Sequence, residues 1–425
     1  MQKTSLLLSN YPQIYQRVSC KSDFDDDSVE FVTGYDIADK IDKRVIKNQI
    51  ANDLILGILS YDEVLIGGSN IWYVIQILGV EVTMHLLRER IIRIINDTCL
   101  NAVVMRENDE WTVDFTSNPM GGNEMSSPKT AEFDFDGWEY IEYDFSRHNL
   151  KGHKAETLLI LIEDGAKKIE NKKIMAIATN ETKKDIKSQQ YFDQYKVENG
   201  KVYVRSTFER LIRLQELNKT CAIASVLNAD SIRCDAEIGK LLSQKSYILS
   251  KQFKDGVSSL NQVLYEKQFP EFGSLFINGT ISLEQILKLR DNFNGKLFRY
   301  WMNYNGYEES DMRADIMNSA NNVLGKSISQ VLRLVSCNLL GCFGFVPGVA
   351  ASAFDSYILN KMASGWHPNF FLDDKVKTTI DESIRRHEGF EKREKYSKIF
   401  YGVNRNDLCP CGSGLKFKKC HGKSL

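Results

Sequence analysis

The sequence predicts a mixed protein of the α+β or α/β class, with a mixed N-terminal half, a mainly helical C-terminal half and a small knuckle at the C-terminus. Three observations support this prediction. Strand-like and helix-like runs alternate up to about residue 218. From about residue 219 to 400, apolar residues recur mainly at helical spacing. Cysteine and histidine residues then gather in the last stretch of the chain.

The composition bounds the domain count and the class of protein. A chain of 425 residues is long enough for two or three domains. Its apolar content of 43% and charged content of 26% are ordinary for a soluble protein. A net charge of −1 gives no global attraction to nucleic acid or membrane, so any basic patch is local. The predicted domains are a mixed α/β domain at 1–218, a mainly helical domain at 219–400 and a tail at 401–425.

The distribution of cysteines and the N-terminal sequence indicate the cellular compartment. Nine cysteines are present, and the six outside the tail are scattered without a disulfide-like framework. This distribution suits a reducing compartment, and we expect a cytoplasmic protein. The run Leu6–Leu8 is too short to be the apolar part of a signal peptide.

The first hundred residues predict an α/β unit. Residues 19–36 open with an acidic loop that leads into a short strand at 29–32, and Asp36 is a plausible N-cap for a helix. Gly67-Gly68-Ser69 could cradle a phosphate at a helix start, but neither the phosphate-loop nor the dinucleotide pattern is complete, which favours a tight turn. The predicted elements are a helix at 37–59, a strand at 63–68, helices at 70–78 and 82–89, and a strand at 91–95.

Residues 101–145 predict a β-rich section with an acidic face. Strands are expected at 101–105, 111–115 and 132–140. The carboxylates of 132–144, including Asp134 and Asp136, could bind a catalytic metal in a metal-dependent hydrolase. A strand spreads alternate side chains about 7 Å apart, which favours a solvated sheet face instead. No complete catalytic motif is present, so enzymatic activity stays an open question.

The pattern then turns increasingly helical. Between 154 and 218 we expect a mixture of helices and strands: a helix at 155–169, a strand at 174–178, a surface helix or loop at 180–190, a strand at 201–204 and a helix at 206–217. In the C-terminal half we expect helices at 236–249, 257–266, 283–292, 310–322, 328–340 and 375–396.

One segment of the helical half carries no charge over 21 residues, from Leu334 to Phe354. That length could span a bilayer. Asn338 and Pro347 dilute its hydrophobicity, so two buried helices broken at 344–347 are the favoured interpretation, and membrane contact is the alternative. The aromatic residues of 365–371 are expected to form a turn that covers this core.

The tail carries the strongest motif. Cys409, Cys411, Cys420 and His421 offer three thiolates and one imidazole, a tetrahedral set that zinc favours. The glycines of the intervening Gly-Ser-Gly at 412–414 let the chain double back. A disulfide between the first two cysteines would span one residue and be badly strained. The sequence therefore predicts a Zn²⁺ site whose metal supplies most of the folding energy.

The spacing and the flanking residues of 405–422 resemble the SEC-C motif, the zinc-binding tail of the bacterial preprotein translocase SecA. The ligand positions match throughout, and the chain departs from the usual pattern at Leu408, Leu415 and Phe417. The resemblance implies zinc binding and permits a partner like those of the SecA tail, the export chaperone SecB or the ribosome. It covers only the tail and implies nothing about the remaining 400 residues.

A binding role follows as the leading hypothesis. Zinc would hold a local set of cations in fixed positions, suited to an acidic protein surface or an RNA backbone. The alternatives are an anti-phage or stress effector that acts on membrane, through 334–354, or on nucleic acid, and the hydrolase described above. The candidate partner-binding residues are Arg405, Lys416, Lys418, Lys419 and Lys423.

Overall fold

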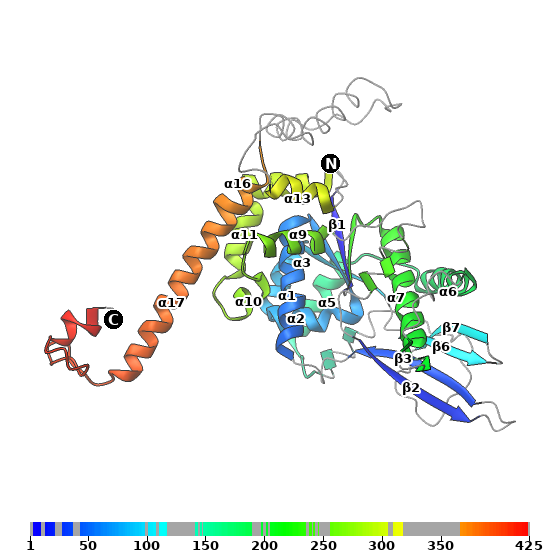
Figure 1. Cartoon of the computed structure of the whole chain (residues 1–425), viewed down its shortest axis with the longest axis horizontal. Coiled ribbons are helices and arrows are strands. Elements are labelled where there is room, and N and C mark those ends of the chain that lie inside the picture. The colour runs from blue at the N-terminus through cyan, green and yellow to red at the C-terminus, as the bar shows by residue number, and fades with distance from the viewer. Residues whose placement is uncertain are drawn as a thin grey trace, which may run out of the picture.

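The computed structural model confirms a mixed α/β protein with a small parallel sheet and a C-terminal cysteine and histidine cluster. Figure 1 shows the described helices and strands gathered in one body, from which a long helix leads to the C-terminus. The described residues are 3–9, 13–21, 28–36, 43–97, 101–107, 110–116, 141–142, 145–146, 148–188, 197–198, 201–202, 205–234, 238–239, 241–242, 245, 256–304, 309–317 and 366–423.

A four-stranded parallel sheet forms the centre of the body. Its strand order is β10-β1-β4-β5, formed by Ser231–Cys234, Ser5–Ser9, Glu63–Gly67 and Ile92–Ile95. The strands predicted at 63–68 and 91–95 are therefore confirmed. Helices cover both faces, which explains why the strand sequences are nearly continuous apolar runs instead of alternating ones.

Strand β1 shows what the N-terminal leucines do. Leu6 pairs with Val64 on one side and Ser231 on the other, so β1 is an interior strand of the sheet. Leu6 and Leu8 belong to the hydrophobic core on one face, and Leu7 belongs to the core on the other. The sequence had predicted no strand here, and none at β10, because each is short and its partners are distant in the chain.

The larger core lies on the face of Leu6 and Leu8, where N-terminal and C-terminal helices meet. Helix α1 contacts four helices of the C-terminal half: α9 (Gly256–Glu266), α10 (Phe272–Ile277), α11 (Leu283–Asp291) and α12 (Phe293–Tyr304). The N-terminal helices of this region are α1 (Lys43–Ser60), α2 (Ile71–Leu78), α3 (Val80–Arg88) and α5 (His153–Gly165). These confirm the predicted helices, with α5 ending earlier than expected.

The opposite face is covered by α6 (Asn171–Ser188) and α7 (Arg205–Leu227), which contact each other. The strand predicted at 174–178 is wrong, because these residues lie within α6. Ile174 and Ala178 are both buried and are four residues apart, which is the helical period. Five residues are too few to distinguish that period from a short buried strand.

A second sheet is antiparallel, with order β2-β3-β6-β7. Asp36 is the last residue of β3 and pairs with Gln13, and its role as a helix N-cap stays a prediction. The short strand predicted within 19–36 is confirmed as part of β3, and the first residues of the loop predicted before it belong to β2. The strands predicted near 101–105 and 111–115 are confirmed. The bounds of β2, β3, β6 and β7 are, in that order, Gln13–Lys21, Ser28–Asp36, Asn101–Glu107 and Glu110–Thr116. A separate two-stranded sheet is formed by β8 (Val197–Glu198) and β9 (Lys201–Val202).

The C-terminal half contributes helices, as predicted, and also strand β10. Helix α11 starts with a capping box between Ser282 and Gln285. In the aromatic turn, Phe371 packs on Phe298 with ring centroids 4.8 Å apart, and Trp366 Nε1 donates to Asn294 Oδ1 at 3.2 Å. The helices are α9 (Gly256–Glu266), α10 (Phe272–Ile277), α11 (Leu283–Asp291), α12 (Phe293–Tyr304), α13 (Glu309–Met317), α16 (Asn369–Phe371), the π-helix η3 (Leu372–Lys377) and α17 (Thr378–Ile399).

Arg290 of α11 ties the C-terminal helices to the sheet. Its guanidinium is 6% exposed and donates to the carbonyl oxygens of Ile58, Tyr61 and Asp62, where α1 ends and β4 approaches. Helix α7 runs through residue 219, and β10 belongs to the sheet of β1. The elements therefore do not mark the predicted boundary near 219, and the division into domains stays a prediction.

Several predicted features lie outside the described residues. These are the acidic strand and hairpin of 132–140, the helix at 328–340 and the uncharged segment 334–354. Of the acidic 132–144 region, Glu142 is described, and it is helical instead of lying on a strand. No helix among the described residues has both the length and the apolar character needed to cross a membrane.

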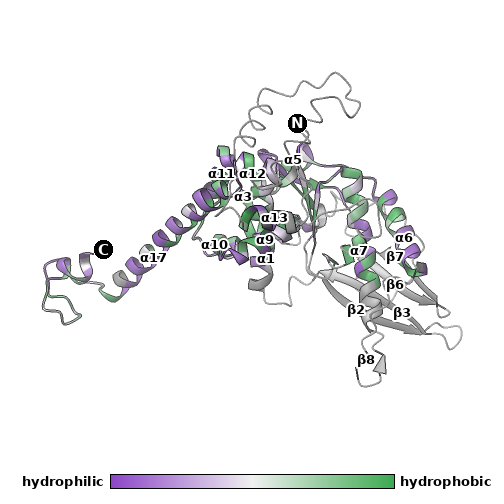
Figure 2. Ribbon diagram, turned by 45° about the horizontal axis from the view of Figure 1, so that its top comes forward, coloured by the Kyte–Doolittle hydropathy of each residue, from purple (hydrophilic) through white to green (hydrophobic). Residues whose placement is uncertain are grey.

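Helix α17 leads away from the body, and the tail lies at its far end, as both Figure 1 and Figure 2 show. In Figure 2 this helix is coloured mostly hydrophilic. The residues from Arg385 to Lys395 include no buried position. The predicted charged, solvated helical approach to the tail is confirmed.

Candidate metal centre

The tail folds as a short antiparallel ladder closed by two single-turn helices. Cys409 N donates to Leu415 O at 2.8 Å, Phe417 N to Asp407 O at 2.7 Å, and Lys418 N to Arg405 O at 2.9 Å. The second pair of candidate ligands follows there: Cys420 lies between η4 (Phe417–Lys419) and η5 (His421–Lys423), and His421 is the first residue of η5. We call residues 405–423 the knuckle.

Two glycines allow the chain to reverse between the ligand pairs. Gly412 has φ of 78° and Gly414 has φ of 69°, values that residues with a Cβ rarely adopt. Gly412 N donates to Cys409 O at 3.2 Å, which tightens the turn around the first pair. The Gly-Ser-Gly sequence therefore performs the reversal predicted for it.

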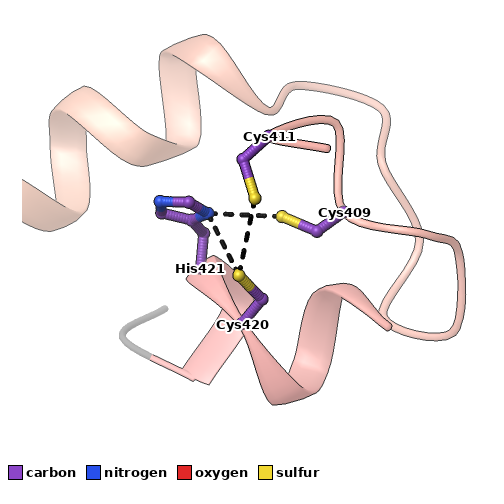
Figure 3. A group of neighbouring side chains, drawn as sticks. All are labelled: Cys409, Cys411, Cys420 and His421. Atoms are coloured by element: carbon purple, nitrogen blue, oxygen red, sulfur yellow. Dashed lines mark hydrogen bonds between the residues drawn. The ribbon is translucent and has the colours of Figure 1, made fainter. Parts of the chain in front are cut away.

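The structure brings the four predicted ligand residues together (Figure 3). Their ligand atoms all lie within 4.8 Å of one another. Cys409 Sγ and Cys420 Sγ lie 3.3 Å and 3.5 Å from His421 Nδ1, and Cys411 Sγ lies 3.6 Å from Cys420 Sγ.

These separations fit one central metal ion. With Zn–S and Zn–N bonds of about 2.3 Å and 2.05 Å, a tetrahedron has edges of about 3.8 Å between sulfurs and about 3.6 Å from sulfur to nitrogen. A disulfide would need about 2.05 Å between sulfurs, and the three cysteines are free. The donor set fits a closed structural site, with four protein ligands and no open position for a substrate.

Local hydrogen bonds favour the ionised form of one ligand. Hydrogen bonds from Ser413 are the main reason that the pKa of the Cys411 thiol falls to about 6. The pKa of His421 is raised, chiefly by its hydrogen bond with Cys409. A metal that binds here therefore meets a thiolate at Cys411 and competes with a proton at His421.

A small aromatic cluster supports the site. Phe417 is 4% exposed and its ring lies 5.2 Å from that of Phe400, which also lies 5.1 Å from the ring of His421. A Cβ at Gly422 would lie 2.7 Å from Phe417 Cδ1, so a glycine is needed at this close approach. Neither the Ser413 hydroxyl nor Phe400 was predicted to be part of the site. Ser413 lies between the two glycines of the turn and Phe400 lies shortly before the motif, and these positions are the signal that could have indicated them.

The five candidate partner-binding residues all lie exposed on the knuckle. Within the described part of the chain none of them forms an ion pair. Their role in binding stays a prediction. They are Arg405, Lys416, Lys418, Lys419 and Lys423.

The glycine turn after β4 does not resemble a phosphate site. A Cβ at Gly67 would lie 2.7 Å from Asp97 Oδ2, and one at Gly68 would lie 3.0 Å from Ile95 O. A buried carboxylate therefore lies against this turn and would repel an anion. Helix α2 begins after Asn70 without a side-chain cap, so Ser69 is not its N-cap. The tight strand-to-helix turn is the better interpretation.

Comparison with known proteins identifies the knuckle and leaves the body unassigned. Residues 405–423 match the SEC-C motif. Three similar proteins are SecA of Anaplasma phagocytophilum (strain HZ), with 69% identity over 67 residues, SecA 1 of Bordetella avium (strain 197N), with 53% over 43, and SecA 1 of Nitrosospira multiformis, with 41% over 51.

These matches are short. They cover 16%, 10% and 12% of this chain in that order, and only 8%, 5% and 6% of the SecA proteins. No solved structure matches the chain. The similarity therefore supports a metal-binding motif and says nothing about the parallel sheet or the helices around it.

Proposed function

We propose that this chain is a bacterial cytoplasmic zinc-binding protein whose knuckle presents a basic surface to a protein or RNA partner. The observation that carries the proposal is the combination of a closed Cys₃His cluster with five exposed cations at the far end of α17.

The ligand set favours zinc as the metal. Thiolates are soft ligands and imidazole is a borderline one, and three of the first with one of the second in a tetrahedron are typical of structural zinc sites. The four ligands are Cys409, Cys411, Cys420 and His421. When bound, zinc would crosslink the two ends of the knuckle and hold its surface in one conformation.

The charge of the knuckle is local and strong. Residues 405–423 hold five cations and one acidic residue, Asp407, whereas the whole chain has a net charge of −1. Asp407 Oδ2 accepts a hydrogen bond from Asn404 N at 2.9 Å, so its carboxylate is engaged within the loop. A concentrated positive surface of this kind attracts carboxylates or phosphates.

Rigidity makes the cations effective. The backbone of Lys418 and Lys419 is fixed by hydrogen bonds to Arg405 O and Lys416 O, at 2.9 Å and 2.8 Å. A partner therefore meets cations whose backbone is already ordered, and binding loses less conformational entropy. The similar tails belong to protein translocase subunits, which makes a protein partner or a ribosomal one reasonable candidates here.

The test is a comparison of captured partners from a bacterial lysate. The tagged full chain is compared with a Cys409→Ser, Cys420→Ser variant and a Lys416→Glu, Lys418→Glu, Lys419→Glu variant. The matched control is Lys168→Glu, Lys173→Glu, Lys187→Glu, which reverses three exposed lysines of the body. We expect one partner to be captured by the parent and the control and lost from both knuckle variants. Identical capture by all four proteins would contradict the proposal.

The other hypotheses rest on residues outside the described part of the chain. Segment 334–354, proposed for a membrane-acting effector, and Asp134 and Asp136 of the hydrolase hypothesis both lie there. No described observation favours either, so the binding role stands as the proposal.

A further inference from the structure

The outer side of the knuckle ladder carries one apolar residue among cations. Leu408 is paired across the ladder with Lys416, so the two side chains lie on the same side. Lys418 N donates to Arg405 O at 2.9 Å, so these two residues lie together beside that pair. Phe417, between the two lysines, is buried, whereas both lysines are exposed. We call Leu408, Lys416, Lys418 and Arg405 the outer patch.

Leu408 is unusually exposed for an apolar residue, at 69%. It is also a position at which the chain departs from the usual motif, so the apolar member of the outer patch is a property of this chain. Leu415 is 49% exposed, and its carbonyl oxygen accepts a hydrogen bond from Cys409 N. The knuckle thus offers two exposed leucines, of which Leu408 is the one paired with a lysine across the ladder.

We infer that the outer patch docks an acidic protein segment that carries an apolar side chain, with Leu408 as the apolar contact. This inference rests on the proposed function and names the partner class. Covering Leu408 removes apolar surface from water, which stabilises a complex with a partner that has an apolar group to offer. The surrounding cations pair with carboxylates on both sides of that group.

A protein fits the outer patch better than RNA does. Single-stranded RNA is held by cations along its backbone and by aromatic side chains on which bases stack. The aromatic residues of the knuckle are Phe417, which is 4% exposed, and His421, which is a metal ligand. A phosphate backbone gains nothing from an exposed leucine, whereas an apolar side chain of a protein does.

The experiment is a double-mutant cycle with the zinc-loaded full chain. The first probe, the leucine peptide, is a short fluorescent peptide with glutamates on both sides of a single leucine. The second probe, the serine peptide, has serine in place of that leucine. Binding is followed by fluorescence anisotropy to the parent, Leu408→Ser and Leu415→Ser, and the zinc content of each protein is measured. A uridine oligonucleotide serves as the RNA probe.

We expect Leu408→Ser to weaken binding of the leucine peptide about tenfold, and to change binding of the serine peptide and the oligonucleotide little. Leu415→Ser should leave the binding of all three probes unchanged. Equal loss for both peptides, no effect of Leu408→Ser, no binding of the leucine peptide to the parent, or tighter binding of the oligonucleotide would each overturn the inference. Loss of peptide binding on reversal of Lys416, Lys418 and Lys419 without an effect of Leu408→Ser would leave the proposed function standing.

Discussion

The parallel sheet and the knuckle are folded by different forces. In the sheet, Val64, Leu65 and Ile66 are fully buried in successive positions, because helices cover both faces. In residues 401–423, only Cys409 and Phe417 are buried. Apolar burial can hold the first region together, whereas a chain of about twenty residues cannot build a sufficient core and needs another source of stability.

The body and the knuckle should therefore lose their structure independently of each other. Helix α17 separates them, and its exposed, charged residues provide no apolar connection over most of its length. Its first part is anchored, since Ile380 is buried in the larger core. Metal should therefore decide the conformation of the knuckle without deciding the stability of the body.

The largest effect is expected from removal of the metal ligands. Cys409→Ser with Cys420→Ser should abolish zinc binding and unfold the knuckle, because metal binding in such sites supplies on the order of 10 kcal/mol. The zinc content measured by elemental analysis should fall from about one ion per chain to none. The melting temperature of the body should not change.

The control for this prediction is Cys221→Ser, a cysteine of α7 outside the cluster. It should leave the zinc content at the parent value. Acidification should release the metal from the parent, since protons compete for thiolate and imidazole ligands. A parallel loss of body stability on metal removal would show that the two regions are coupled.

A smaller effect, on the stability of the body, is expected from Arg290→Met. Burial lowers the pKa of Arg290 to about 10, which still leaves it charged at neutral pH. The variant loses the bonds to the carbonyls of Ile58, Tyr61 and Asp62 and should reduce the unfolding free energy of the body by about 3 kcal/mol.

Chemical denaturation followed by circular dichroism measures this change, and zinc content should stay at the parent value. The matched control is Lys288→Met on the same helix, which loses only an exposed pair with Glu284 and should change the stability of the body little. Equal stability of the two variants would exclude a structural role for Arg290.

The smallest effect concerns the pH dependence of the body. Asp230 Oδ2 accepts a hydrogen bond from Ser5 N at 2.7 Å, and partial burial raises the pKa of its carboxyl. The folded state therefore holds this proton more tightly than the unfolded state, and stability falls as pH rises from about 4 through the raised pKa.

Asp230→Asn removes that titration. Its stability relative to the parent should increase between acidic and neutral pH by less than about 1 kcal/mol, since the group is partly exposed. Denaturation curves at the two pH values measure the difference. A difference of the opposite sign would mean that ionised Asp230 is favoured in the folded body.

The candidate site was predictable because it is local. Cys409, Cys411, Cys420 and His421 lie within thirteen consecutive positions, and their spacing with the glycine turn leaves few ways for the chain to fold. The support from Phe400 and Ser413 was not predictable in the same way. A phenylalanine before a motif and a serine between glycines have many ordinary explanations.

Most of the body followed from periodicity, and the errors came where periodicity is uninformative. Long helices such as α1 and α17 were predicted because many turns repeat the same pattern. The short run at 174–178 was predicted as a strand and is part of α6. Strands β1 and β10 were not predicted, because they span only five and four residues and hold too few apolar positions to show a period.

The sequence by itself determined the knuckle, its ligands and its surface charge, because neighbours in the chain are neighbours in space there. Only the tertiary structure decided that Leu6–Leu8 form an interior strand between β4 and β10, and that Arg290 joins the C-terminal helices to the end of α1. Those contacts join residues more than fifty positions apart, and they are selected by which apolar faces can be buried together. That choice depends on the packing of the whole body and is not written in any one segment.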